Sequence, residues 1–308
     1  MADILRGGVI GAGVFGGHHA RKYAVAEGVA LSAVLDPQHP EKAAALAVPL
    51  GGRAFVDLAE FLDAVDVVTV ASPGVTHAEL ALAALKAGKP VYVEKPLAVT
   101  LRDADAIVAE AARRKLTVAC GHQERVLFQT IGLFDIPQQP LRLEAVRHGP
   151  EPERGMDVSV VLDLMIHDLD LALKLTTAQP FAVEAEGERA YSGGWDRARA
   201  EVTFDSGFTA VFDASRMAPE RRRSMKVVYP SGEVEIDFLT REFRNTTGFA
   251  LNPDFADTAA AKDTIAANVA AFLDAVRGLA PRPIVTAEEA ARALDLALAV
   301  EQALEDQG

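Results

Sequence analysis

The chain has 308 residues, of which half are hydrophobic and 24% are charged, and its formal net charge is −13 at pH 7. This length is enough for two domains with buried cores. The negative charge argues against a nucleic-acid-binding surface, which needs clustered lysine and arginine side chains to neutralise phosphates. The single cysteine, Cys120, excludes an internal disulfide bond and a cysteine-based metal cluster.

The N-terminal residues show no secretory signal pattern, and no apolar run approaches the length of a membrane span. We therefore expect a cytoplasmic protein that binds neither nucleic acid nor a membrane.

The first functional motif is a glycine-rich turn between a predicted strand ending at residue 10 and a predicted helix at residues 17–26. Its sequence is Gly11-Ala12-Gly13-Val14-Phe15-Gly16. In such a turn Gly11 permits the tight bend, Gly13 lets the backbone approach a pyrophosphate, and Gly16 allows close helix–strand packing. The free N–H groups at the start of the helix attract the same pyrophosphate. This motif predicts a dinucleotide-binding site.

The second strand points to the identity of the dinucleotide. Residues 29–35 form an apolar run that ends in Asp36, 20 residues beyond Gly16. A carboxylate at this place accepts hydrogen bonds from both ribose hydroxyls of NAD and repels a 2′-phosphate. Pro37 and Gln38 supply no arginine to offset that repulsion. The sequence therefore predicts NAD, with NADP as the less favoured cofactor.

Apolar strands and alanine-rich helices alternate up to residue 120, which predicts a parallel doubly wound sheet, the Rossmann architecture. In such sheets ligands bind outside the carboxyl ends of the strands. The predicted strand at residues 65–71 ends at Ser72-Pro73, and His77 follows in the first turn of the next helix. The predicted strand at residues 91–93 runs into Glu94-Lys95-Pro96. These residues are therefore candidate ligand contacts.

Beyond residue 120 the pattern changes to strands joined by hairpin turns. Strands are predicted at residues 141–146, 183–190, 198–204, 208–214, 225–229 and 234–238. With a helix predicted at residues 157–175, they describe an open, mainly antiparallel sheet with a helix on one face, an α+β domain. We expect a Rossmann domain at residues 1–120 and a substrate-binding and oligomerisation domain at residues 121–308.

Two helices are predicted at the C-terminal end of the chain, at residues 263–278 and 286–305. The second begins with a capping box, in which Thr286 is the N-cap and Glu289 the third helical residue. Residues 246–263 form a polar connection for which the sequence predicts no conformation.

The helix predicted at residues 157–175 carries a candidate acid–base pair. Asp163 and His167 are four residues apart, so a regular helix places them on one face. A carboxylate beside an imidazole holds its tautomer and raises its basicity, as a general base near neutral pH requires. The alternative is an ordinary surface ion pair. A metal site is not expected, because Asp163 and the histidines lack a third ligand at suitable spacing.

Together these residues resemble the Gfo/Idh/MocA family of sugar and cyclitol dehydrogenases over nearly the whole chain. The resemblance rests on the glycine motif with His19, Asp36, Ser72-Pro73 with His77, Glu94-Lys95-Pro96, and Asp163-x-x-x-His167. It implies that Lys95 lies between nicotinamide and substrate, with Asp163 and His167 across from it, and that Glu94 contacts the nicotinamide ribose. The implied cofactor site comprises Gly11, Gly13, Val14, Phe15, Gly16, Asp36, Ser72, Pro73, His77, Glu94 and Lys95.

The catalytic residues expected from this resemblance are Lys95, Asp163 and His167. His167, oriented by Asp163, takes the hydroxyl proton, while Lys95 favours the developing negative charge on oxygen. A crowded lysine can instead have a lowered pKa and act as the acid–base group itself. Both assignments of the proton acceptor remain open at this point.

Within the family, a closer resemblance is to members that oxidise the 3-hydroxyl of UDP-N-acetylglucosamine or its uronate. It rests on Gly121-His122-Gln123-Glu124-Arg125, the loop from Arg147, the segment from Asp157 to Asp168, Asp196, and Ala214-Ser215-Arg216. The substrate-binding residues expected from it are Arg125, Arg147, Arg216 and Arg222. Guanidinium groups form bidentate hydrogen bonds with phosphates, so Arg147, Arg216 and Arg222 would suit a diphosphate.

Two other functions remain open. One is an inositol or simple aldose dehydrogenase that uses the same catalytic residues. The other is a catalytically silent NAD-binding sensor or regulatory protein, which the fold alone does not exclude. We expect the open face of the second sheet to be apolar. We also expect the protein to form a homodimer or homotetramer through this face.

Overall fold

The computed structural model describes residues 4–151 and 157–306. The chain divides into two compact units, which are described separately below. The first comprises Met1–Gln123 and Asp263–Ala291, and the second comprises Glu124–Lys262 and Arg292–Gly308. The segment Asp263–Ala291, assigned to the second domain from the sequence, thus has its contacts in the first unit.

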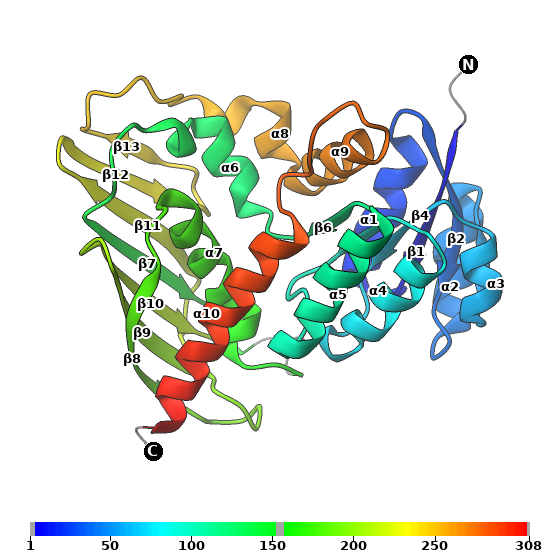
Figure 1. The fold of residues 1–308 in the computed structure, drawn as a ribbon, viewed down its shortest axis with the longest axis horizontal. Helices are drawn as coiled ribbons and strands as arrows, with labels where there is room; N and C mark the ends of the chain where they lie inside the picture. The colour runs from blue at the N-terminus through cyan, green and yellow to red at the C-terminus, as the bar shows by residue number, and fades with distance from the viewer. Residues whose placement is uncertain (1–3, 152–156, 307–308) are drawn as a thin grey trace. The chain divides into compact units, whose positions relative to one another are not determined.

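The first unit contains a six-stranded parallel sheet in the order β3-β2-β1-β4-β5-β6 (Figure 1). This is the doubly wound order of dinucleotide-binding domains, and it confirms the predicted Rossmann fold. The strands are β1 (Leu5–Ile10), β2 (Val29–Leu35), β3 (Arg53–Phe55), β4 (Val67–Val70), β5 (Val91–Val93) and β6 (Val118–Cys120). The helices are α1 (Val14–Val25), α2 (Pro40–Ala47), α3 (Leu58–Asp63), α4 (His77–Lys86), α5 (Leu101–Arg114) and α9 (Thr264–Val276).

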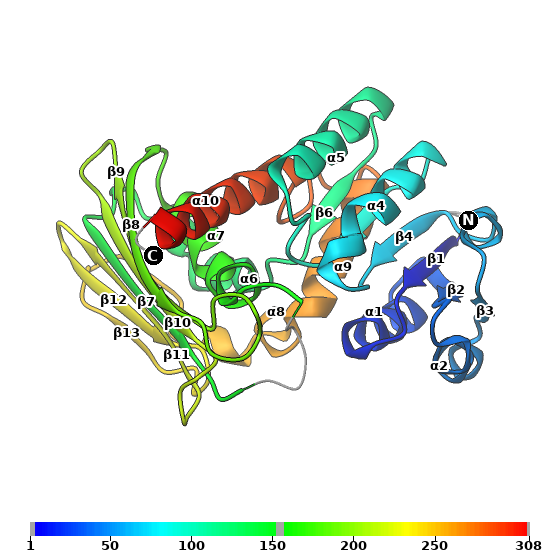
Figure 2. The ribbon, with the colours of Figure 1, turned by 90° about the horizontal axis from the view of Figure 1, so that it is seen from below.

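Helices cover both faces of this sheet, which explains why its strands are continuous apolar runs. All residues of β4 and β5 are buried. Helices α1 and α9 lie on one face and α4 and α5 on the other (Figure 2). Val269 and Phe272 of α9 belong to the same core as Val9 and Tyr92, and the Tyr92 and Phe272 rings lie 5.9 Å apart. Helix α9 therefore completes the first core.

The second unit contains a seven-stranded sheet in the order β13-β12-β11-β7-β10-β9-β8. Among the strand pairs of this sheet in the described residues, only β7–β10 is parallel, so the predicted open, mainly antiparallel sheet is confirmed. The strands are β7 (Arg142–His148), β8 (Pro180–Glu188), β9 (Arg197–Phe204), β10 (Thr209–Ser215), β11 (Arg222–Tyr229), β12 (Gly232–Asp237) and β13 (Phe243–Asn245). The helices are α6 (Glu124–Ile131), α7 (Ile166–Leu175), α8 (Ala259–Lys262) and α10 (Ala287–Asp306), whose first residues belong to the first unit.

Helices α6, α7 and α10 lie on one face of the seven-stranded sheet (Figures 1 and 2). In β9, β11 and β12, buried residues alternate with more exposed ones, as in Arg197–Phe204. The opposite face was expected to be apolar, but it carries charged pairs. Lys226 lies 2.7 Å from Glu233, and Arg142 lies 2.7 Å from Glu144. The predicted oligomer remains a prediction.

The chain differs from the predicted elements mainly between residues 121 and 175. Helix α6 was not predicted, and the long helix expected at residues 157–175 is not regular throughout. A π-helical turn, η4 (Val161–Met165), precedes α7. The capping box at the start of α10 is confirmed, because Glu289 N–H donates to the Thr286 hydroxyl and Thr286 N–H donates to the Glu289 carboxylate.

Three-residue 3-10 helices occur at Val48–Leu50, Gly74–Thr76, Leu133–Asp135 and Phe255–Asp257. Across residues 4–151 and 157–306, every helix is too short or too polar to cross a membrane.

Candidate active site

The glycine motif forms the turn between β1 and α1. Gly11 has φ of +100°, which favours glycine, and a Cβ there would lie 2.7 Å from the Ala71 carbonyl oxygen. A Cβ on Gly16 would lie only 1.8 Å from the Gly11 carbonyl oxygen, so α1 can pack this closely only with glycine. No atom lies within 4 Å of the Cβ position of Gly13. The turn thus leaves space for a ligand against the Gly13 backbone.

The start of α1 faces this space without a side-chain cap. Gly13 is the N-cap residue and, as a glycine, has no side chain that could cap the first turn. Val14 and Phe15 follow, with exposed fractions of 53% and 40%. N–H groups in a helix's first turn lack intrahelical acceptors and attract anions. This turn therefore fits the pyrophosphate of a dinucleotide.

Asp36 lies at the carboxyl end of β2 and is hydrogen-bonded to the backbone of the glycine turn. Its Oδ2 accepts a hydrogen bond from Ala12 N–H at 3.0 Å, and its Oδ1 accepts from the N–H groups of Gln38 and His39 at 3.2 and 2.9 Å. An ionised carboxylate has about four acceptor sites, so a further hydrogen bond from a ribose hydroxyl remains possible. Asp36 fits an unphosphorylated adenosine ribose.

Glu94, directly after β5, is held by His19 from α1. The Glu94 Oε1 atom accepts a hydrogen bond from His19 Nε2 at 2.6 Å, and both side chains are buried. A Cβ on Gly121 would lie 2.6 Å from Glu94 Oε2, so glycine makes room for this carboxylate. Burial raises the pKa of Glu94, but the hydrogen bond from His19 and the charges of His19 and Lys95 bring it below its usual value. Glu94 is therefore an ionised acceptor at neutral pH.

His77 connects the carboxyl ends of two neighbouring strands. Its Nδ1 lies 2.7 Å from the Pro96 carbonyl oxygen and its Nε2 lies 2.9 Å from the Ser72 carbonyl oxygen. Burial, which outweighs both carbonyl contacts, lowers the pKa of the imidazole. Both ring nitrogens thus face the protein backbone. His77 contacts the Ser72-Pro73 and Lys95-Pro96 segments, and Lys95, the first residue of the second segment, is half-buried.

The second unit contains the predicted His167, in the first turn of α7. Its Nδ1 lies 2.8 Å from Oε2 of Glu124, the first residue of α6. The sequence did not indicate this contact, because no helix was predicted at residues 124–131 and a contact between different elements leaves no spacing signal. The motif that contains Glu124 was the only available hint. Asp163 lies within the π-helical turn, and its predicted role in orienting His167 remains a prediction.

Arg147 links the same carboxylate to α7. Its Nη1 donates to Glu124 Oε1 at 2.8 Å, and its Nε and Nη2 donate to the two oxygens of Asp168 at 2.9 and 2.8 Å. Arg147 is 2% exposed. Its guanidinium group therefore binds carboxylates of its own unit on all three nitrogens.

Two other arginines predicted to bind substrate are also buried in ion pairs. Arg125 forms a bidentate pair with Asp170, at 2.7 and 2.6 Å. Arg216 lies 3.2 Å from Asp196 and donates to the Val158 carbonyl oxygen at 2.6 Å. The first pair joins α6 to α7, and Arg216 joins the end of β10 to the segment before η4, so we expect a structural role for both arginines.

Three consecutive arginines, Arg221, Arg222 and Arg223, lie at the start of β11, and the last two are on opposite faces of the sheet. Arg222 is exposed and pairs in register with His148. Arg223 pairs in register with Arg147, on the face that carries the buried Met225. Burial lowers the pKa of Arg223, and the charges of Arg147 and Arg221 lower it further. Arg223, which was not among the predicted substrate-binding residues, lies on the same face as Arg147.

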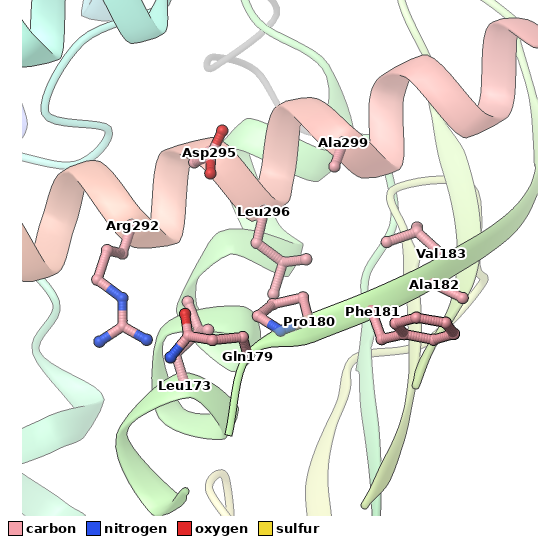
Figure 3. Close-up of a pocket in the computed structure, with 10 residues that line it drawn as sticks. All are labelled: Leu173, Gln179, Pro180, Phe181, Ala182, Val183, Arg292, Asp295, Leu296 and Ala299. Carbon is pink, nitrogen blue, oxygen red and sulfur yellow. The ribbon is translucent and has the colours of Figure 1, made fainter. Parts of the chain in front are cut away.

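A surface pocket of about 390 Å³ on the second unit lies between α10 and β8. Leu173, Phe181 and Arg292 are among its lining residues, and Phe181 is 80% exposed (Figure 3). It contains none of the predicted site residues. Within the described ranges, no cluster of three or more histidine, cysteine, aspartate or glutamate side chains is arranged to hold a metal ion.

Comparison with known proteins identifies the family. Residues 5–122 match the Gfo/Idh/MocA oxidoreductase family model with an NAD-binding Rossmann fold, and residues 140–235 match the Gfo/Idh/MocA C-terminal domain. The sequence is 36% identical to the UDP-N-acetylglucosamine 3-dehydrogenase of Acidithiobacillus ferrooxidans, over 98% of this chain and 99% of that protein. A solved structure of that enzyme matches with a TM-score of 0.89 at 35% identity, covering 99% of both chains.

The myo-inositol 2-dehydrogenase of Thermotoga maritima is 31% identical, over 70% of this chain and 69% of that protein. Both halves of the chain thus match one family. The chain belongs to the Gfo/Idh/MocA family of oxidoreductases, which are NAD-dependent dehydrogenases acting on CH–OH groups of sugars.

Proposed function

We propose that the protein oxidises a secondary alcohol of a nucleotide-sugar with NAD, and that the 3-hydroxyl of UDP-N-acetylglucosamine is the first candidate. The observation that carries this proposal is the 36% identity to a UDP-N-acetylglucosamine 3-dehydrogenase over 98% of the chain. That similarity includes the second unit, which we propose to bind the substrate.

The residues of the first unit fit NAD. Gly11, Gly13 and the start of α1 would hold the pyrophosphate, Asp36 the adenosine ribose and Glu94 the nicotinamide ribose. When bound, NAD accepts the hydride released from the alcohol carbon. The carboxylate of Asp36 disfavours the 2′-phosphate of NADP, and the next three residues supply no arginine. We therefore propose NAD as the working cofactor.

Proton transfer is assigned to the predicted catalytic residues. We propose that His167 accepts the hydroxyl proton at Nε2, since its Nδ1 contacts the Glu124 carboxylate. Lys95 contributes a positive charge that favours the alkoxide as the proton leaves. Asp163 is proposed to assist His167. A lysine of lowered pKa is the alternative proton acceptor, and variants of the two residues distinguish the assignments.

A second candidate is the oxidation of an inositol or a simple aldose. The 31% identity to a myo-inositol 2-dehydrogenase favours it, although that similarity covers only 70% of the chain. A substrate with a nucleoside diphosphate would need positive charge in the second unit, and an inositol would not.

The experiment that decides between them measures the formation of NADH from NAD, and then of NADPH from NADP, by the purified protein. The substrates are nucleotide-sugars, aldoses and inositols at matched concentrations. The proposal predicts the highest kcat/KM for UDP-N-acetylglucosamine with NAD. Turnover of inositols alone would favour the second candidate. NADH binding without turnover of any substrate would contradict the enzymatic proposal and favour the sensor. Light scattering in the same buffer tests the proposed homodimer or homotetramer.

A further inference from the structure

We infer that Glu124 is the positioning residue that sets the tautomer of His167, and that Arg147 and Asp168 hold Glu124 for this purpose. The inference rests on the proposed function of His167 and deepens it. It assigns a role to a residue outside the Lys95, Asp163 and His167 set expected from the sequence.

The geometry fixes the Glu124 carboxylate from both sides. Its Oε2 lies 2.8 Å from His167 Nδ1, and its Oε1 accepts a hydrogen bond from Arg147 Nη1 at 2.8 Å. Each oxygen therefore has a different partner, and the carboxylate cannot rotate without breaking both contacts. The Glu124 and His167 side chains are only 15% and 13% exposed, so water competes weakly for these contacts.

The charge of Glu124 decides which nitrogen of His167 carries hydrogen. Burial raises the pKa of Glu124, but the neighbouring charges of His167 and Arg147 bring it well below its usual value. An ionised carboxylate has no hydrogen to offer, so a bare Nδ1 lone pair 2.8 Å from it would be repelled, and hydrogen on Nδ1 is the favoured state. In a neutral imidazole the lone pair then lies on Nε2, which becomes the proton acceptor.

Arg147 keeps this carboxylate in place through a second one. Its Nε and Nη2 bind Asp168, the residue next to His167, at 2.9 and 2.8 Å. The chain Asp168–Arg147–Glu124–His167 therefore starts and ends on α7 and passes through β7 and α6. Arg223 of β11 lies close to Arg147. Burial lowers the pKa of Arg223, and the positive charge of Arg147 lowers it further.

The primary test is the tautomer itself, measured by long-range ¹H–¹⁵N NMR of the imidazole nitrogens in the full-length protein without cofactor. The H167Q variant assigns the His167 signals among the seven histidines. The inference predicts hydrogen on Nδ1 in the wild type. Hydrogen on Nε2 would overturn it, and this result needs no variant of Glu124.

The second test is the E124Q variant, whose side-chain amide can donate to Nδ1 and stabilise the opposite tautomer. We expect a changed NMR signature and a fall of about 10² to 10⁴-fold in kcat, with the KM for NAD unchanged, as for the loss of an acid–base group. Wild-type kcat together with a wild-type signature would overturn the inference.

The D170N variant is the matched control. It removes the carboxylate of Asp170, which forms a separate buried ion pair between α7 and Arg125. It should lower the melting temperature while the His167 signature stays that of the wild type. Loss of the signature in D170N would attribute the E124Q result to general destabilisation and overturn the inference. Full turnover by H167Q would instead contradict the proposed base while the tautomer result stands on its own.

Discussion

Arg223 and Arg147 lie opposite each other across the β7–β11 pair, with both side chains on the helix-covered face of the second sheet. Arg147 binds carboxylates with all its nitrogens, whereas the pKa of Arg223 is lowered by burial and by neighbouring arginines. An anion near Arg223 would relieve this repulsion. A nucleotide-sugar diphosphate is such an anion.

We therefore predict that R223M raises the KM for a nucleotide-sugar by about tenfold or more, since a hydrogen bond to a charged group contributes about 1.5–3 kcal/mol. The KM for an uncharged sugar should change little. The R222M variant tests the residue predicted from the sequence, which lies on the other face. A larger effect in R222M than in R223M would show that the anion binds at the exposed face.

The second prediction concerns Lys95. The K95M variant should lose several orders of magnitude in kcat, because the positive charge that favours the alkoxide is gone. NAD binding, followed by fluorescence titration, should remain close to that of the wild type. Unchanged turnover would remove Lys95 from the catalytic residues.

The third prediction concerns cofactor choice. In the D36S variant the ratio of kcat/KM for NAD to that for NADP should fall by about 10-fold to 100-fold, as expected for one charge-assisted hydrogen bond and a removed repulsion. Asp36 also accepts a hydrogen bond from Ala12 N–H, so affinity for both cofactors should weaken. The ratio, measured in steady-state assays, separates these two effects. A ratio equal to that of the wild type would contradict the role of Asp36.

The fourth prediction concerns pH and Asp196. Burial raises the pKa of this carboxyl, but hydrogen bonds from Ser192, Tyr191 and Ala190 bring it from 3.8 down to about 2. Because the folded value lies below the unfolded one, the carboxylate stabilises the protein fully above pH 4. That stabilisation of about 2 kcal/mol is lost as pH falls toward 2.

Urea unfolding of the wild type and D196N should therefore give a difference of at least about 2 kcal/mol at pH 7 that shrinks toward pH 2. The exposed pair of Arg6 and Asp66 provides the control, since D66N should cost at most about 1 kcal/mol. A D196N difference that stays constant with pH would show that ionisation of Asp196 is not the cause.

The fifth prediction concerns α9. F272A should destabilise the first unit by about 3–5 kcal/mol, because Phe272 is fully buried against Tyr92. F181A removes the same side chain from a position that is 80% exposed and should cost almost nothing. Thermal unfolding of both variants tests the contrast, and equal melting temperatures would contradict it.

The Rossmann unit was predictable because its information is local. Most of its strands are short apolar runs. Gly11 is favoured by its own φ of +100°, and Gly16 by the carbonyl oxygen of Gly11 in the same turn. The capping box at Thr286 and Glu289 is likewise local. Such features leave a spacing signal that one sequence is enough to detect.

The partners of the candidate catalytic residues were not predictable, because they come from distant parts of the chain. Glu124 reaches His167 only because α6 packs beside α7, and His19 reaches Glu94 only because α1 covers the sheet. The environment of each arginine was not predictable for a related reason. Whether a guanidinium group is exposed or paired depends on strand register, which places Arg222 and Arg223 on opposite faces.

The return of Asp263–Ala291 to the first unit also constrains how this chain can be recombined. A fragment ending at Gln123 would lack Val269, Phe272 and Leu273, and would expose the apolar surface that they cover. In a chimera whose residues after 123 come from a relative, some core residues of the first unit, such as those of α9, would also come from that relative. Changes of substrate during evolution must therefore keep the inner surface of α9 compatible with Tyr23 and Tyr92, so the two halves cannot diverge independently.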